Sequence, residues 1–435
     1  MNIPRIDLPR VVVLGAGFAG LQVAKRIDPT QYQLVLIDKN NFHTFQPLIY
    51  QVASSGLEPD SVAYPIRKTL RGKKNTFYRM AQVNNINLDT STIHTDIGDL
   101  SYDKLVIATG ANNNFFNNKE IEENALPMKS LTDALDLRSK ILGNFEQALN
   151  TKDLNRRDEL MNFVIVGGGP TGVELAGALA ELKNKILPKD FPDLDFRQMK
   201  IHLIEAGPKL LAGMSEKSSV KAFEYLRKID VHVWLNTFVE TYQNGEVKTS
   251  DEGSFRTETL IWAAGVKGNV PDGLDATYFG RNNRLITDQF CAMNGFSNVY
   301  VLGDAGLIQS ELYPEGLPML ASVAMQQGKY LAQSFNREAR GKEVFPFIYV
   351  DKGTMATIGR NKAVAEISKL KLKGVFAWAV WMLVHLMLLV GFRNRVVVLV
   401  NWAWNYVNYN NGLRLIVRPY KKTGTRKEAS ALQID

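Results

Sequence analysis

The chain has 435 residues, of which 45% are hydrophobic and 22% charged, which is typical of a folded protein with room for two or three domains. Its single cysteine, Cys291, excludes disulfide bonds within the chain and CxxC redox pairs. Disulfide reductases and thiol-based sulfide oxidases are therefore excluded. We expect the lone thiol to behave as a buried small hydrophobe.

The net charge of +8 is distributed unevenly. Residues 367–427 contain eleven Lys and Arg and no Asp or Glu, so the rest of the chain has a net charge of −3 (+8 minus 11). Such a basic tail suits either nucleic acid or an anionic lipid surface. At the other end, Arg5, Asp7 and Arg10 leave no apolar segment before the first strand, so we expect no secretory signal.

Residues 11–38 predict a dinucleotide-binding βαβ unit. An apolar strand leads into the turn GAGFAG, a helix follows, and a second strand ends in Asp38. The glycines of the pattern are Gly15, Gly17 and Gly20. They permit a tight turn, close approach to a pyrophosphate and close helix–strand packing, and Asp38 is placed to accept from a ribose. The alternative is a glycine-rich turn without a ligand. Both strands and the acid favour the nucleotide.

The segment of residues 40–75 is neither clearly helical nor clearly extended. Strand-like runs follow at residues 77–84 and 92–97. Residues 104–111 then predict a buried strand that ends in a turn of small residues, including Thr109 and Gly110.

The βαβ pattern occurs a second time. A strand over residues 163–166 leads into GGGPTG, a helix is expected over residues 173–183, and a strand over residues 200–204 ends in Glu205. The glycines are Gly167, Gly169 and Gly172, and residues 187–196 form an insertion. Two such units predict two bound dinucleotides. The simplest reason to hold two is to pass a hydride from one to the other.

Several blocks resemble known families. IATGA (residues 107–111), IWAAGV (261–266) and VYVLGDAG (299–306) resemble flavoproteins with two dinucleotide-binding domains. More specific blocks resemble type II NADH:quinone oxidoreductases: FHTFQPLIYQVASSGL (42–57), VGGGPTGVELAGALAE (166–181), AMQQGKYLA (324–332) and YVDKGTMATIGRNKAV (349–364). The Trp-rich basic tail has the same resemblance.

The resemblance implies an α/β fold with two Rossmann-like domains, the second inserted in the first, and a C-terminal membrane-anchoring helical region. The implied boundaries are residues 1–112 and 284–345 for the FAD domain, 113–283 for the NADH domain and 346–435 for the C-terminal region. The implied cofactor-binding residues are Gly15, Gly17, Gly20, Asp38, Gln46, Thr109, Gly110, Asp304, Gly167, Gly169, Gly172, Glu205 and Gly265.

Two of the acids have alternative interpretations. Asp304 follows a strand and a glycine, where Asp is common in turns; the resemblance makes it a ligand of the FAD ribityl chain, and its apolar surroundings favour that role. Glu205 is either a solvated strand end or an acceptor for a free 2′-hydroxyl that repels a 2′-phosphate, which favours NADH over NADPH. Nearby Lys209 softens that preference.

The predicted catalytic residues come from the same resemblance. Glu174 is expected in the first turn of its helix, as a dipole partner or as the family's functional Glu between nicotinamide, flavin and quinone. Gln326 and Gln327 lie in a helix expected over residues 321–336 and resemble a quinone-pocket pattern in which Ser322 replaces the first Gln. Surface positions are the alternative for both. Lys352 is a candidate for supplying a proton or a charge, or a solvated turn lysine. We expect no metal site, because the five His residues are scattered.

The tail contains nineteen uncharged residues, 374–392, which is long enough for a transmembrane helix. Similar basic flanks on both sides make a single span awkward, and a second apolar stretch, residues 396–407, is too short to span. Tryptophans with neighbouring Lys and Arg suit helices that lie in the headgroup region. We therefore favour a monotopic anchor over a span, and lipid over nucleic acid.

The sequence thus predicts a peripheral membrane flavoenzyme that oxidises NADH through FAD and reduces a membrane quinone without pumping protons. The expected location is the cytoplasmic side of the cell inner membrane, with a homodimer as one possible assembly. A reductase of a soluble electron carrier and a membrane-docked NADH sensor are the alternatives.

Overall fold

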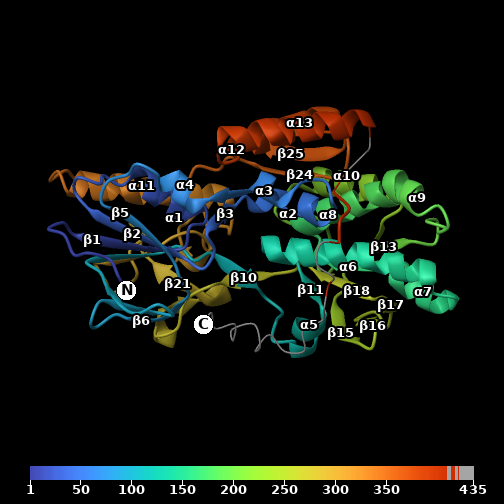
Figure 1. Ribbon diagram of the computed structural model, residues 1–435, viewed down its shortest axis with the longest axis horizontal. Coiled ribbons are helices and arrows are strands. Elements are labelled where there is room, and N and C mark those ends of the chain that lie inside the picture. The colour runs from blue at the N-terminus through green and yellow to red at the C-terminus, as the bar shows by residue number, and fades with distance from the viewer. Residues whose placement is uncertain (409–412, 417–419, 421–435) are drawn as a thin grey trace. The chain divides into compact units, whose positions relative to one another are not determined.

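A computed structural model describes residues 1–408, 413–416 and 420 of the chain (Figure 1). The chain forms two compact units, each assembled from three separate stretches. Unit 1 comprises Met1–Thr44, Ala63–Asn112 and Val266–Lys352. Unit 2 comprises Phe45–Val62, Asn113–Gly265 and Gly353–Asp435.

Unit 1 is built on a five-stranded parallel sheet of order β22-β9-β1-β2-β5. The strands are β1 (Arg10–Leu14), β2 (Gln33–Asp38), β5 (Thr76–Met80), β9 (Lys104–Ile107) and β22 (Val299–Val301). Helices α1 (Phe18–Arg26) and α11 (Ala321–Glu338) pack on one face, where Val11 and Val13 share a core with Val23 and Leu331. Because both faces of a parallel sheet are covered, β1 is buried along its whole length.

The opposite face of this sheet is covered by an antiparallel sheet of order β6-β7-β8. Its strands are β6 (Val83–Asn87), β7 (Thr92–Thr95) and β8 (Leu100–Ser101). Smaller elements of the unit are β3 (Phe42–Thr44), β4 (Ala63–Pro65), α4 (Ile66–Leu70), β20 (Phe279–Gly280), β21 (Arg284–Thr287) and β23 (Gly306–Ile308). The prediction that Cys291 is buried is confirmed.

Unit 2 contains a second five-stranded parallel sheet, of order β11-β18-β12-β13-β14. The strands are β11 (Leu126–Pro127), β12 (Asn162–Val166), β13 (Lys200–Glu205), β14 (His232–Leu235) and β18 (Thr259–Trp262). The main helices are α6 (Leu131–Asn150), α7 (Leu154–Met161), α8 (Pro170–Glu181) and α10 (Glu216–Arg227). The predicted α/β class with two Rossmann-like βαβ units is therefore confirmed.

Further elements of unit 2 lie around this sheet. Short helices are α2 (Ile49–Ala53), α3 (Pro59–Val62), α5 (Lys119–Asn124) and α9 (Leu187–Asp190), the last within the predicted insertion. An antiparallel sheet consists of β15 (Val239–Gln243), β16 (Glu246–Thr249) and β17 (Ser254–Arg256). Between α8 and α9, residues 182–186 widen into a π-helical turn.

The C-terminal part of unit 2 is an antiparallel sheet followed by two helices. These elements are β24 (Thr354–Thr357), β25 (Ala363–Ile367), β26 (Leu370–Lys373), α12 (Val375–Leu388) and α13 (Phe392–Asn408). Figure 1 shows α12 and α13 in red, and α12 packs against both β25 and α13. Because α12 ends at Leu388 and α13 begins at Phe392, the uncharged segment of residues 374–392 does not form one continuous helix. No helix in the described residues combines the length and apolarity that a membrane crossing needs. The polar end of the chain, residues 421–435, lies outside the described residues.

Candidate functional site

The first glycine turn has the backbone geometry that only glycine supplies. Gly15 has φ +96°, and a Cβ built on it would lie 2.4 Å from the carbonyl oxygen of Ala108. Gly20 packs against the carbonyl of Gly15, while nothing lies within 4 Å of a Cβ on Gly17. Protein atoms therefore fill the space at Gly15 and Gly20, whereas the space at Gly17 is open. An open glycine at this point of the turn lets a pyrophosphate approach the backbone N–H groups.

Asp38 closes the same turn. Its carboxylate accepts from the backbone N–H of Ala16 at 2.6 Å and of Asn40 at 2.7 Å. Burial raises the pKa of this carboxyl, and the two N–H groups act in the opposite direction.

The second turn repeats this arrangement in unit 2. Gly167 has φ +112°, and a Cβ there would lie 2.8 Å from backbone atoms of Ala263 and Ala264. The Glu205 carboxylate accepts from the N–H of Gly168 at 2.6 Å and of Gly207 at 2.7 Å. Glu205 is therefore fixed by the backbone and is not the freely solvated strand-end acid of the alternative interpretation.

The other predicted cofactor-binding residues of unit 2 differ in their surroundings. Gly172 packs on the carbonyl of Gly167, whereas Gly169, the N-cap of α8, has open space around its Cα. Gly265 has φ +69° and faces the ring of Phe116. Gln46 is an exposed residue of a short 3-10 helix in the same unit.

Polar groups gather at the carboxyl ends of β9 and β22 in unit 1. The Thr109 hydroxyl is buried and has no hydrogen-bond partner among the described residues. Gly110 has φ +74° with open space around it. Asp304 lies in a 3-10 turn after β22, and the N–H of Gly303 donates to Gln327 Oε1 at 2.6 Å. An orphaned buried hydroxyl beside an open glycine fits a bound polar group.

The two glutamines of α11 differ. Gln327 is buried and holds the Gly303 turn, while Gln326 exchanges hydrogen bonds with the backbone of Val350 at 2.9 and 3.1 Å. The surface alternative is thus wrong for Gln327. Lys352 is exposed.

Glu174 is a buried acid with a raised pKa. Because α8 begins at Pro170, Glu174 lies in its second turn, and the expected first-turn position is wrong. The side chain is 6% exposed, and its Oε1 accepts from the Thr357 N–H at 3.3 Å and from the Trp381 indole N–H at 3.2 Å. Burial raises its pKa to about 8, against these two hydrogen bonds. A dipole partner in water has none of these features.

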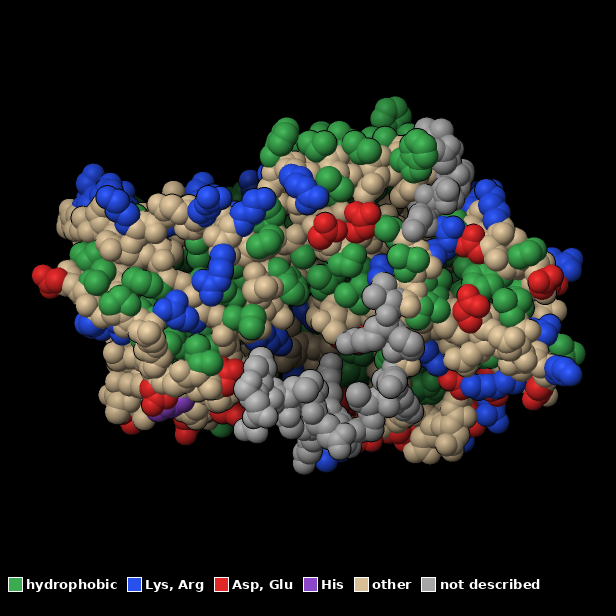
Figure 2. All heavy atoms as spheres, in the orientation of Figure 1, with side chains coloured by type: hydrophobic (Ala, Val, Ile, Leu, Met, Phe, Trp, Pro, Cys, Tyr) green, Lys and Arg blue, Asp and Glu red, His purple; other side chains and the backbone are tan. Residues whose placement is uncertain are grey.

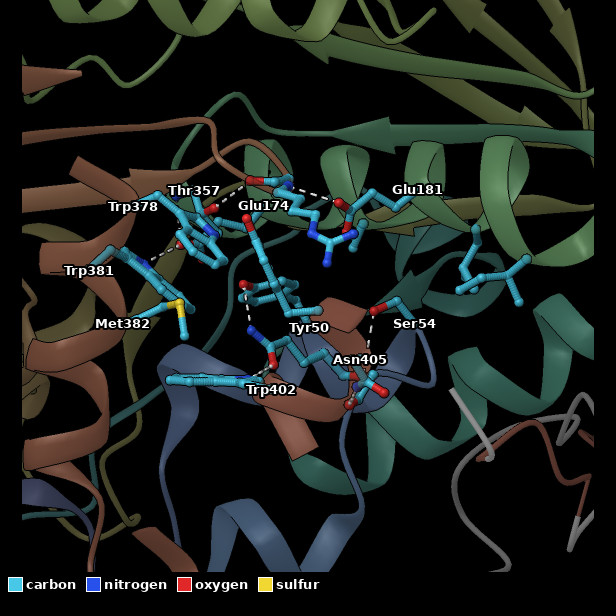
Figure 3. Close-up of a pocket in the computed structure, with 18 residues that line it drawn as sticks. Tyr50, Ser54, Glu174, Glu181, Thr357, Trp378, Trp381, Met382, Trp402 and Asn405 are labelled. Atoms are coloured by element: carbon cyan, nitrogen blue, oxygen red, sulfur yellow. Dashed lines mark hydrogen bonds between the residues drawn. The ribbon is translucent and has the colours of Figure 1, made fainter. Parts of the chain in front are cut away.

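Glu174 lines a pocket of unit 2, shown in Figure 3. The walls come from α2, α8, the β24 region and both C-terminal helices. They include Tyr50, Gln51, Ser54, Glu181, Thr357, Arg360, Trp378, Trp381, Met382, Trp402, Asn405 and Tyr406. Aromatic walls around a few polar groups are characteristic of a site for a flat, largely apolar molecule.

The C-terminal helices contribute indoles with defined partners. Trp381 is 2% exposed and stacks on His385, one turn along α12, with ring centroids 4.2 Å apart. Its ring also packs on Trp402, at 5.7 Å, and the Trp402 N–H donates to Gln51 Oε1 at 2.9 Å. Burial lowers the pKa of His385 to about 4, so this imidazole is neutral at pH 7.

A second carboxyl of the pocket, Glu181, is half-buried and lies at the end of α8, the helix of Glu174. It accepts from the N–H of Arg360 at 2.8 Å, and burial raises its pKa. The guanidinium of Arg360 lies 3.8 Å from the ring centroid of Tyr406. The sequence interpretation found Glu174 but missed this wall, because the tail tryptophans were assigned only to lipid.

Comparisons with known proteins find relatives over most of the chain. The family described as pyridine nucleotide-disulphide oxidoreductase matches residues 9–328, and the one described as NDH2 C-terminal domain matches residues 352–408. The chain is 36% identical over 420 residues to the type II NADH:quinone oxidoreductase NdhA of Mycobacterium tuberculosis, covering 93% of this chain and 88% of that one. It is 29% identical over 369 residues to the type II NADH:quinone oxidoreductase of Staphylococcus aureus (strain NCTC 8325 / PS 47), covering 83% and 90%.

A solved structure has the same fold. NDH2 from Plasmodium falciparum, determined in complex with NADH, matches with a TM-score of 0.86 at 22% identity, covering 94% of this chain and 100% of that one.

Proposed function

This chain belongs to the type II NADH:quinone oxidoreductases, and from that premise we propose which of its residues serve the reaction. It is an enzyme that oxidises NADH and reduces a quinone by two electrons, with FAD and NADH as its cofactors and without proton pumping. FAD, when bound, supplies the two-electron transfer between the two substrates. The chain's own residues bind the cofactors, orient the substrates and exchange protons with them.

In unit 1 the proposed FAD-binding residues are Gly15, Gly17, Gly20, Asp38, Thr109, Gly110 and Asp304. Support comes from the open space at Gly17 and from the buried Thr109 hydroxyl, which no described residue partners. In unit 2 the proposed NADH-binding residues are Gly167, Gly169, Gly172, Glu205 and Gly265. Gln46 stays a prediction from the resemblance, as do the domain boundaries at residues 112, 283 and 345.

We propose that the Glu174 pocket receives the quinone headgroup. The observation that carries this proposal is a buried carboxyl with a pKa of about 8 among aromatic walls. At pH 7 such a group is protonated, so it donates a hydrogen bond to a quinone oxygen and releases a proton as that oxygen gains negative charge. Roles for Gln326, Gln327 and Lys352 at the quinone remain predictions. Gln327 is already committed to the Gly303 N–H.

The test is Glu174→Gln, which keeps the volume and removes the acid. We expect NADH-dependent reduction of a quinone to fall by roughly 100-fold, which is the usual contribution of a positioned acid. Flavin reduction by NADH in a single turnover should change little. The matched control is Gln22→Glu, which places a carboxyl at the equivalent position of α1, seven residues after the first glycine of its turn, beside Arg26. Equal quinone turnover in Glu174→Gln and the wild type would refute the assignment.

Relatives of this class are membrane-associated, and we propose that α12 and α13 lie in the membrane interface on the cytoplasmic side of the inner membrane. Support comes from their exposed apolar side chains, which Figure 2 shows gathered over these helices. Exposed fractions reach 79% for Phe376, 81% for Phe392 and 61% for Trp404. Exposed apolar patches of this kind mark sites of interaction with a protein or a membrane. Arg393 and Lys373, exposed beside them, suit anionic headgroups. A homodimer stays a prediction.

A tail truncation would also remove Trp381 from the pocket, so point variants test the anchor better. Phe376→Ser with Phe392→Ser should shift full-length protein from the membrane fraction to the soluble fraction, because each exposed Phe contributes roughly 2 kcal/mol on burial. Turnover with a water-soluble quinone should be retained. Leu312→Ser, at a position 86% exposed in unit 1, is the control and should not change partitioning. A double variant that stays fully membrane-bound would contradict the interfacial role.

A further inference from the structure

The orientation of one hydroxyl in the Glu174 pocket is fixed by a chain of hydrogen bonds. The chain starts at the Trp402 indole N–H, which donates to Gln51 Oε1 at 2.9 Å. Gln51 Nε2 in turn donates to the Tyr50 hydroxyl oxygen at 2.9 Å. Figure 3 shows both bonds as dashed lines beside Tyr50 and Trp402.

The direction of this chain follows from the donor inventory. An indole N–H only donates, so the Gln51 atom that faces Trp402 must be the amide oxygen. The amide nitrogen then faces Tyr50 and donates to it. The Tyr50 oxygen is thereby an acceptor from Gln51, and its own O–H proton must point elsewhere.

No acceptor for that proton is present in the described part of the chain. Tyr50 is only 5% exposed and lines the pocket, so bulk water does not readily supply the acceptor. A buried hydroxyl proton without a partner is unfavourable, and a ligand oxygen in the pocket would satisfy it. The titratable groups whose fields act on the Tyr50 hydroxyl are the carboxyls of Glu174 and Glu181 on α8.

We propose that the Tyr50 hydroxyl donates a hydrogen bond to a carbonyl oxygen of the quinone, and that Trp402, acting through Gln51, is the positioning residue that holds it in the donor orientation. This inference rests on the proposed use of the pocket. Burial and the neighbouring carboxyls raise the pKa of Tyr50 well above 10, so the phenol keeps its proton. Tyr50 therefore polarises and orients the carbonyl, whereas Glu174 is the group that releases a proton.

The experiment measures equilibrium binding to the flavin-loaded, full-length protein by quenching of tryptophan fluorescence. The probes are menadione, which has two carbonyl oxygens, and 2-methylnaphthalene, which has none. Tyr50→Phe should weaken menadione binding by roughly 3- to 10-fold, the usual effect of one neutral hydrogen bond, and leave 2-methylnaphthalene binding unchanged. Tyr242→Phe is the matched control, because it removes another buried hydroxyl of unit 2, bonded to Thr257 O at 3.2 Å. It should change neither affinity.

Trp402→Phe tests the positioning role while retaining an aromatic wall. Alone it should weaken menadione binding by less than Tyr50→Phe does. In the Tyr50→Phe background it should have no further effect on menadione affinity, because it acts through the lost hydroxyl. Additive losses would overturn the role of Trp402.

The possible failures are distinguishable. If menadione does not quench the wild type, no quinone occupies the pocket and both proposals fail. If the wild type binds menadione and Glu174→Gln lowers quinone turnover as expected, but Tyr50→Phe binds menadione as the wild type does, only the present inference fails. Equal weakening of both probes would also overturn it, because a general packing defect does not distinguish a carbonyl from a hydrocarbon.

Discussion

The two glycine turns of this chain have nearly the same backbone and different surroundings. At each, the first glycine has a positive φ and the acid at the end of the second strand accepts an N–H from the residue after that glycine. The helices that follow diverge. α1 packs against α11, where Gly328 lies close to the carbonyl of Ala19. α8 instead packs against α2 and β24, and its residues Glu174, Ala178 and Glu181 line the pocket.

The difference is concentrated at one equivalent position. Seven residues after the first glycine, α1 has Gln22 and α8 has Glu174. Gln22 bonds to Arg26 on its own helix, whereas Glu174 bonds to β24 and α12. The two units therefore share the glycine pattern and differ in the packing of the helix that follows it.

The largest expected effects come from the glycines themselves. Gly15→Ala should yield protein with little bound flavin, and Gly167→Ala should keep its flavin while KM for NADH rises by roughly tenfold or more. A left-handed backbone costs a side chain about 1–2 kcal/mol, and the new Cβ also meets backbone atoms at 2.4 Å and 2.8 Å respectively. Flavin absorbance and NADH kinetics measure the two outcomes. Gly143→Ala, with open space around it on α6, should be neutral. Equal loss of flavin in both variants would contradict the assignment of FAD to the first turn and NADH to the second.

The second prediction concerns stability against pH. A carboxyl whose pKa is raised on folding binds its proton more tightly in the folded state, so stability falls as pH rises from about 4.5 to about 8. At roughly 1.4 kcal/mol for each pH unit, the Glu174 contribution is on the order of 5 kcal/mol over this window. Tm should fall less steeply with pH in Glu174→Gln. Glu122→Gln, at an exposed carboxyl, should retain the wild-type slope. Parallel slopes in both variants would show that Glu174 is not buried as described.

The smallest effect concerns the two acids of the turns. Glu205→Gln should raise kcat/KM for NADPH a few-fold relative to NADH, because the neutral amide no longer repels a 2′-phosphate. Asp38→Asn should leave the donor preference unchanged, since it belongs to the first turn. Steady-state kinetics with both donors measures this ratio. A wild type that uses both donors equally would contradict the role of Glu205.

The sequence by itself determined the features that depend on neighbours in the chain. The strand, the glycines and the acid of each turn lie within one βαβ unit, so their spacing predicted both turns. The helix that contains Gln326 and Gln327 was also predicted correctly. Its family resemblance supplied the activity and Glu174. The environment of Glu174 depends on contacts across long stretches of chain. Trp381 is 207 residues away, and Trp402 is 351 residues from Gln51.

Only the tertiary structure could decide what the tail does inside the protein. Hydropathy classes an indole as apolar, which assigned Trp381 and Trp402 to the lipid. Folding buries Trp381 and directs both indole N–H groups to polar partners, because a buried donor must find an acceptor. The side chains left exposed on the same helices, such as Phe376 and Phe392, are the ones that remain available to a membrane. A one-dimensional pattern cannot separate these two faces, since the partners that define them come from α2 and α8.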